Sequence, residues 1–209
     1  MFKKDQDFIA FENVMRLAFE RVPIRILDWC IMPDHWHLVL WPENDGDLTA
    51  FVRQLTMTHA QRWKHAHNAV GQGHLYQGRF KSFPIEEDER LLRVLRYVER
   101  NPVRAERVER AQDWRWGSCH VRKTPRHHLS SLLAEWPVDR PMHWNRLVNQ
   151  PQSAAEEAAM KLHIARGRPC GTMEWTQRVS RRLQLEKTLR DPGRQAGWRK
   201  KKEEPNAEI

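Results

Sequence analysis

Two histidines one residue apart form the first candidate for chemistry. The stretch "MPDHWHLVLWP", Met32 to Pro42, places His35 and His37 inside a segment otherwise composed like a buried strand. Because a strand repeats every two residues, both imidazoles project from one face, whereas on a helix they would point about 200° apart. The pair therefore predicts a chelating site if the segment is extended. Two hydrogen-bonded structural histidines stay an equal alternative until a partner group is found.

The partner group is expected on a helix later in the chain. Tyr97 and Asn101 in "RYVERNPVRA" are four residues apart and share one helix face. A phenol attacks only an activated electrophile, and a metal bound to a phosphodiester oxygen supplies that activation. The Asn101 carbonyl suits Mg²⁺ or Mn²⁺ as a third ligand beside two imidazoles. Taken alone, Tyr97 is more typical of a helix-surface residue beside Arg93 and Arg104, and only its combination with Asn101 and the histidine pair favours a nucleophile.

The elements that must position these residues follow from apolar spacing. The pattern predicts a helix over 5–21, a hairpin of strands at 24–32 and 35–41, and a helix that begins at Asp47. A strand in "RFKSFPI" (79–85) would carry Arg79 and Lys81 on one face. The next helix opens with the acidic residues 86–89 and stops at Pro102. This order of helices and strands predicts an α+β fold.

The amino-acid composition indicates which class of molecule the protein binds. The net charge is +9 and the pI is near 9.9, which favours an anionic partner, with nucleic acid first and a membrane surface second. There is no apolar run of the ~18 residues that a spanning helix needs, and no amphipathic anchor or signal peptide, so we expect no membrane association and a cytoplasmic, nucleoid-associated protein. The three cysteines form no CxxC pair, which argues against a disulfide framework or a structural zinc site.

Several blocks of the sequence resemble one family. The segments "MPDHWHLVLWP", "GHLYQGRFKSFPIEEDERLLRVLRYVERNPVRA" and "DWRWGSCH" resemble the REP-associated tyrosine transposases, a branch of the single-tyrosine transposases with a His-hydrophobe-His motif. The resemblance covers roughly residues 2–120, with a further match in "RGRPCGTMEWTQRVSRRLQLEKTLR". It implies a ferredoxin-like antiparallel sheet with helices packed on it. It also implies that His35 and His37 bind the metal, that Asn101 helps to hold it, and that Tyr97 is the nucleophile.

The resemblance implies a reaction as well. Tyr97 would attack a phosphate of single-stranded DNA that carries palindromic, hairpin-forming repeats, and would form a 5′-phosphotyrosine with Mg²⁺ or Mn²⁺ as cofactor. Basic residues would hold the DNA, and the candidates are Arg79, Lys81, Arg93, Arg104, Arg199, Lys200 and Lys201. The C-terminal part is rich in such residues, with 13 Lys or Arg against 3 Asp or Glu between Lys161 and Lys202. A solvated tail is an equal alternative for its end.

The chain departs from the family at its first residues. The family's domain opens with a strand before the first helix, and here that strand is absent, so we expect an unpaired edge at the histidine strand. We divide the chain into a truncated catalytic domain (1–120), a helical extension (121–190) and a basic, disordered tail (191–209). Either the true start lies upstream, or this is an inactive, decaying copy that only binds DNA hairpins. A replication initiator or relaxase is disfavoured because no P-loop occurs. A monomer and a homodimer both stay open.

Overall fold

The computed structural model describes residues 1–190. No helix in this range is long and apolar enough to cross a membrane. The elements are α1 (Asp5–Arg21), β1 (Arg25–Ile31), β2 (Trp36–Trp41), α2 (Asp47–Ala66), α3 (Glu89–Glu99), α4 (Asn101–Arg104), η1 (Ala111–Asp113), α5 (Ser118–Lys123), η2 (Ser130–Leu132), α6 (Trp144–Asn149), α7 (Ala154–Arg166), α8 (Met173–Arg182) and η3 (Glu186–Leu189).

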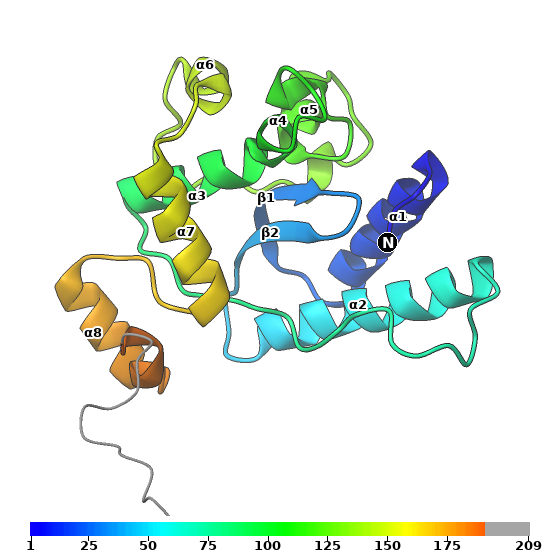
Figure 1. The fold of residues 1–209 in the computed structure, drawn as a ribbon, viewed down its shortest axis with the longest axis horizontal. Coiled ribbons are helices and arrows are strands. Elements are labelled where there is room, and N and C mark those ends of the chain that lie inside the picture. The colour runs from blue at the N-terminus through cyan, green and yellow to red at the C-terminus, as the bar shows by residue number, and fades with distance from the viewer. Residues whose placement is uncertain (191–209) are drawn as a thin grey trace, which may run out of the picture.

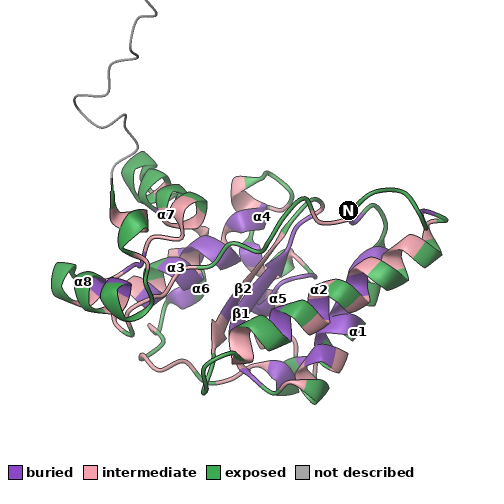
Figure 2. Cartoon of the chain, turned by 90° about the horizontal axis from the view of Figure 1, so that it is seen from below, coloured by how far each residue is buried: buried purple, intermediate pink, exposed green. Residues whose placement is uncertain are grey.

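A two-stranded antiparallel hairpin lies at the centre, with helices on both faces (Figure 1). Helices α1 and α2 pack together on one face through an apolar cluster that includes Phe11, Met15, Phe51 and Leu55. Helix α3 covers the other face, and α6 packs against α3, within a second apolar cluster. Figure 2 shows β1 buried between these layers. The α+β class predicted from the sequence is confirmed, with two strands in the sheet of residues 1–190.

The hairpin is where the alternating pattern placed it. Its turn at Pro33 and Asp34 is closed by a hydrogen bond from the Met32 amide to the His35 carbonyl, at 2.8 Å. The register pairs Cys30 with His37. Side chains alternate between the two clusters: Leu38 packs in the first and Val39 in the second.

Helix α3 differs from its predicted bounds at both ends. Asp88 caps α3 by accepting a hydrogen bond from the Arg90 amide, so the helix begins at Glu89 and not at Glu86. Glu86 instead accepts a hydrogen bond from the Thr172 amide at 2.6 Å. Pro102 does not stop the helical path, because it lies in the first turn of α4, where its missing N–H is not needed. A break at Arg100 thus separates α3 from α4.

The two edges of the sheet have different environments. The outer edge of β1 is covered: Ile31 donates its amide hydrogen to the Trp116 carbonyl, and Ala134 donates to the Ile26 carbonyl. The outer edge of β2 is open, since within residues 1–190 no backbone hydrogen bond joins β2 to a segment other than β1. This is the edge at which the resemblance predicts an unpaired strand, and no strand precedes α1 in the described residues.

The predicted strand in "RFKSFPI" is wrong. Residues 79–84 form no strand, and only a single bridge joins Ile85 to Cys170. A strand needs a partner edge as well as suitable residues, and a cavity separates this segment from β2. Arg79 and Lys81 therefore lie on an irregular, exposed segment and not on a sheet face.

The region after α5 is helical, as predicted, and it adds to both apolar clusters. Leu129 and Leu132 belong to the first cluster, and Trp144 and Val148 to the second. The boundaries at residues 120 and 190 stay predictions. The basic residues Arg199, Lys200 and Lys201 lie outside the described residues.

Candidate active site

The hairpin brings the two histidines together. His35 directly precedes β2 and His37 lies within it, and their ring centroids are 4.9 Å apart with planes at 83°. Because a metal–imidazole bond is about 2.1 Å long, two rings that share one ion have centroids roughly 4.5–5 Å apart. The separation of the two rings is therefore compatible with chelation of one ion.

Asp34 orients the first histidine, a role that the sequence prediction missed. Its Oδ1 lies 2.8 Å from Nδ1 of His35, which leaves Nε2 of His35 for another ligand. The hydrogen bond with His35 lowers the pKa of the Asp34 carboxyl. The signal was the acidic residue directly before the first histidine, in a turn where its side chain reaches back to the ring.

His37 is neutral at neutral pH. Burial is the main cause, and the nearby His35 and Arg104 add to it, so that the pKa of His37 falls to about 3. A neutral imidazole has a free lone pair, which a metal ion needs. His37 can therefore bind a cation without first losing a proton.

Tyr97 faces His37 from α3. Its ring centroid is 6.1 Å from that of His37, and the two rings are nearly perpendicular. Both residues line one cavity of about 160 Å³ between β2, α3 and the segment 80–85, whose remaining walls include Leu38, Phe80, Lys81, Phe83, Val94 and Val98. A residue on a helix and a residue on a strand therefore meet at the same opening.

Asn101 lies one turn after Tyr97, at the start of α4. It is buried, with 5% of its surface exposed, and its side-chain nitrogen has no hydrogen-bond partner in the described residues. This nitrogen is a hydrogen-bond donor, so an acceptor such as a phosphate oxygen would satisfy it, whereas a metal ion would be bound by the carbonyl oxygen of the same amide. No cluster of three or more His, Cys, Asp or Glu residues in 1–190 could hold a metal ion. A metal here would therefore depend on the two imidazoles, with the Asn101 amide as the third candidate ligand.

The other predicted residues divide into two groups. Arg104 lies at the site, with its guanidinium carbon 3.9 Å from the centroid of the Tyr97 ring, and Lys81 lines the cavity. Arg93, which lies one helical turn before Tyr97, is exposed and forms an ion pair with Glu89 at 2.9 Å. Arg79 is exposed and is not among the residues that line the cavity.

The second tyrosine has a different setting. The Tyr76 hydroxyl lies 2.6 Å from Nδ1 of His59. Burial raises the pKa of the Tyr76 phenol above its ordinary value. A phenol that resists deprotonation and already has a hydrogen-bond partner is a poor nucleophile. Of the two tyrosines, Tyr97 is the one next to the histidine pair.

Comparison with known proteins gives the family. The family model described as "Transposase IS200 like" matches residues 1–101. A protein of Haemophilus influenzae (strain ATCC 51907 / DSM 11121 / KW20 / Rd) named "Putative REP-associated tyrosine transposase" is 33% identical over 124 residues, which cover 54% of this chain and 70% of that protein. No solved structure matches. The chain belongs to the IS200-like transposase family, among the REP-associated tyrosine transposases.

Proposed function

We propose that the chain cuts and rejoins single-stranded DNA through a covalent tyrosine intermediate, with the help of Mg²⁺ or Mn²⁺. The observation that carries the proposal is the meeting of Tyr97 and His37, whose ring centroids are 6.1 Å apart although they come from different elements. A nucleophile beside a candidate cation site is the arrangement that phosphoryl transfer requires. Membership in a transposase family supports a reaction on DNA.

Each residue has a defined task in this reaction. The Tyr97 oxygen forms a bond to the scissile phosphorus while the bond from phosphorus to the 3′ oxygen breaks. The phenol loses its proton, and the departing 3′ oxygen gains one, so the products are a 5′-phosphotyrosine and a free 3′-OH. His35, His37 and Asn101 would hold the metal, which when bound neutralises charge on the phosphate oxygens. Asp34 keeps the His35 ring turned for that purpose.

The net charge of +9 supports a nucleic-acid partner. Lys81 at the cavity, Arg79 on the same exposed segment and Arg93 on α3 are the candidates for phosphate contacts near the site. Arg199, Lys200 and Lys201 are further candidates by their charge alone. We expect the substrate to be a single strand with a hairpin from a palindromic repeat, because the family resemblance implies it.

The test is a covalent-adduct assay. A labelled single-stranded hairpin is incubated with Mg²⁺ or Mn²⁺, and bound DNA is separated under denaturing conditions. We expect an adduct with the wild-type protein and with Tyr76→Phe, which removes the other phenol, and none with Tyr97→Phe. An adduct with Tyr97→Phe would overturn the proposal. A salt-sensitive complex with no adduct in any variant would favour the alternative, a hairpin-binding protein that does not cleave.

A further inference from the structure

Arg104 lies directly against the candidate nucleophile. Its guanidinium lies over the face of the Tyr97 ring, at 3.9 Å from the ring centroid, and stacking of this kind holds the guanidinium plane in one orientation. The break at Arg100 and the short helix α4 place it there.

The neighbouring Arg96 and Arg100 donate hydrogen bonds within the protein, whereas no hydrogen bond or ion pair of Arg104 is found within residues 1–190, although Nε of Arg100 is also buried without a partner there. Arg96 donates hydrogen bonds to the Leu147 and Gln150 carbonyls, and Arg100 donates to the Val148 and Asn149 carbonyls, so both hold the end of α6. By contrast, Nη1 of Arg104 is buried and has no hydrogen-bond partner within the described part of the chain.

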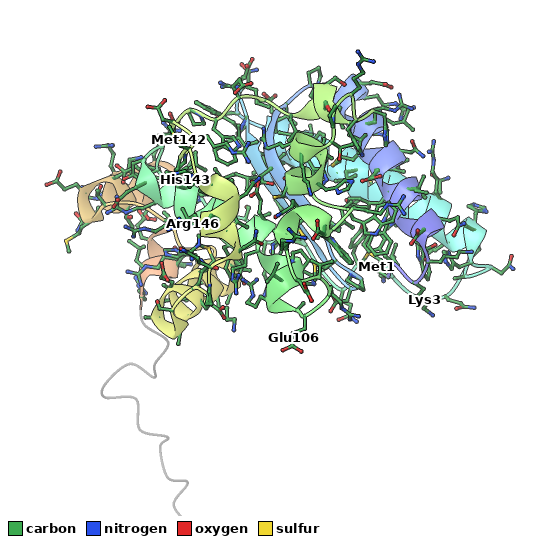
Figure 3. All side chains as sticks on the ribbon, turned by 90° about the horizontal axis from the view of Figure 1, so that it is seen from above. Met1, Lys3, Glu106, Met142, His143 and Arg146 are labelled. Atoms are coloured by element: carbon green, nitrogen blue, oxygen red, sulfur yellow. The ribbon has the colours of Figure 1, made fainter. Side chains whose placement is uncertain are left out.

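No acidic side chain within residues 1–190 neutralises Arg104 at ion-pair distance. The nearest acidic residue in sequence, Glu106, points away from the body of the molecule (Figure 3). A buried charged donor without a partner costs free energy, and a ligand that accepts its hydrogen bond removes that cost. Since the donor is a guanidinium, the ligand that fits is an anion.

We propose that Arg104 is a catalytic residue that binds a non-bridging oxygen of the scissile phosphate. The inference rests on the proposed function and names a group that acts on the reacting atoms. The guanidinium stays protonated while the Tyr97 oxygen bonds to phosphorus and the 3′ oxygen leaves, and its hydrogen bonds strengthen as negative charge grows on the phosphate. The stack on Tyr97 fixes the distance between nucleophile and phosphate.

The binding step can be tested without cleavage, because the chain contains only two tyrosines. In protein labelled with 3-fluorotyrosine, the fluorine signals of Tyr97 and Tyr76 are assigned with Tyr76→Phe and then followed during titration with inorganic phosphate at constant ionic strength. We expect the Tyr97 signal to move to saturation and the Tyr76 signal to stay. The movement should vanish in Arg104→Gln and persist in the control Arg107→Gln, which changes an exposed arginine three residues later. Equal movement in Arg104→Gln, or none in the wild type, would overturn the inference.

Cleavage gives the second readout. Arg104→Gln should lower the cleavage rate of bound hairpin by about 100-fold, since loss of one donor to a developing oxyanion has an effect of this order, while hairpin affinity stays within about threefold. Arg104→Lys should recover part of the rate, because it keeps the charge but not the planar fork. If Arg104 serves only to pack on Tyr97, Lys and Gln should be equally slow, and the melting temperature should fall in both. If the wild type forms no adduct but phosphate still binds through Arg104, the proposed function fails and the anion site stands.

Discussion

Glu12 on α1 allows a quantitative test of how burial of a carboxyl group affects the free energy of unfolding. Its side chain is 4% exposed, and its Oε1 has no hydrogen-bond partner among the described residues. Burial raises the pKa of this carboxyl from 4.5 to about 7, although the positive charge of Arg115 acts in the opposite direction. The folded state thus keeps a proton that the unfolded state loses at lower pH.

The sign and size of the effect follow from that difference. Since the unfolded chain binds fewer protons between pH 4.5 and about 7, the free energy of unfolding falls as pH rises through this window. The whole effect is about 3 kcal/mol, because each pKa unit corresponds to about 1.4 kcal/mol. About 2.5 kcal/mol of it falls between pH 5 and pH 8. Glu12→Gln removes this proton equilibrium and keeps the shape of the side chain.

Urea unfolding followed by tryptophan fluorescence measures the effect. We expect Glu12→Gln to gain about 2.5 kcal/mol relative to the wild type when the pH is raised from about 5 to about 8. Contributions of other groups, including His59, cancel in this comparison. Glu20→Gln on the same helix is the control, because Glu20 is exposed and paired with Arg16, and its difference from the wild type should change little with pH. A pH-independent difference for Glu12→Gln would refute the assignment of a buried, protonated carboxyl.

Three further predictions concern the site and the DNA. Tyr97→Phe should leave hairpin affinity within about threefold of the wild type in a filter-binding assay, because only the phenol oxygen is lost, and a larger drop would mean that the hydroxyl takes part in binding. Tyr76→Phe should lower the free energy of unfolding by about 1 kcal/mol, because the hydrogen bond with His59 is lost, and an unchanged value would show that this bond contributes nothing. Deletion of residues 194–209 should weaken binding to unrelated hairpins alike and flatten its salt dependence, whereas an unchanged salt slope would identify the segment as a solvated tail.

The sequence predicted the parts of the site that depend on local spacing. His35 and His37 share a face because the hairpin follows period-two alternation, and Tyr97 and Asn101 are one helical turn apart. These relations need only the geometry of one strand or one helix. That Tyr97 lies opposite His37 could be predicted only from the family resemblance, because this proximity depends on how α3 packs on the sheet.

The parts that could not be predicted depend on tertiary neighbours. The residues of segment 79–85 suit a strand, but no strand edge lies beside them, so propensity alone gave the wrong answer. The stacking of Arg104 on Tyr97 depends on the break at Arg100, and a proline at position 102 was expected to end the helix and not to begin α4. No sequence pattern indicates that Nη1 of Arg104 is buried without a hydrogen-bond partner among the described residues.

The most direct test of the active site compares His35→Ala, His37→Ala and the double variant in the adduct assay with Mg²⁺ or Mn²⁺, with melting temperatures measured alongside. If both rings hold one ion, each single change should remove most metal-dependent cleavage, the double change should add little, and hairpin binding without metal should survive. If the pair were only structural, each change should lower the free energy of unfolding by roughly 1–3 kcal/mol additively, and cleavage would decline only as the protein unfolds. Full adduct formation by the folded double variant would contradict the metal site.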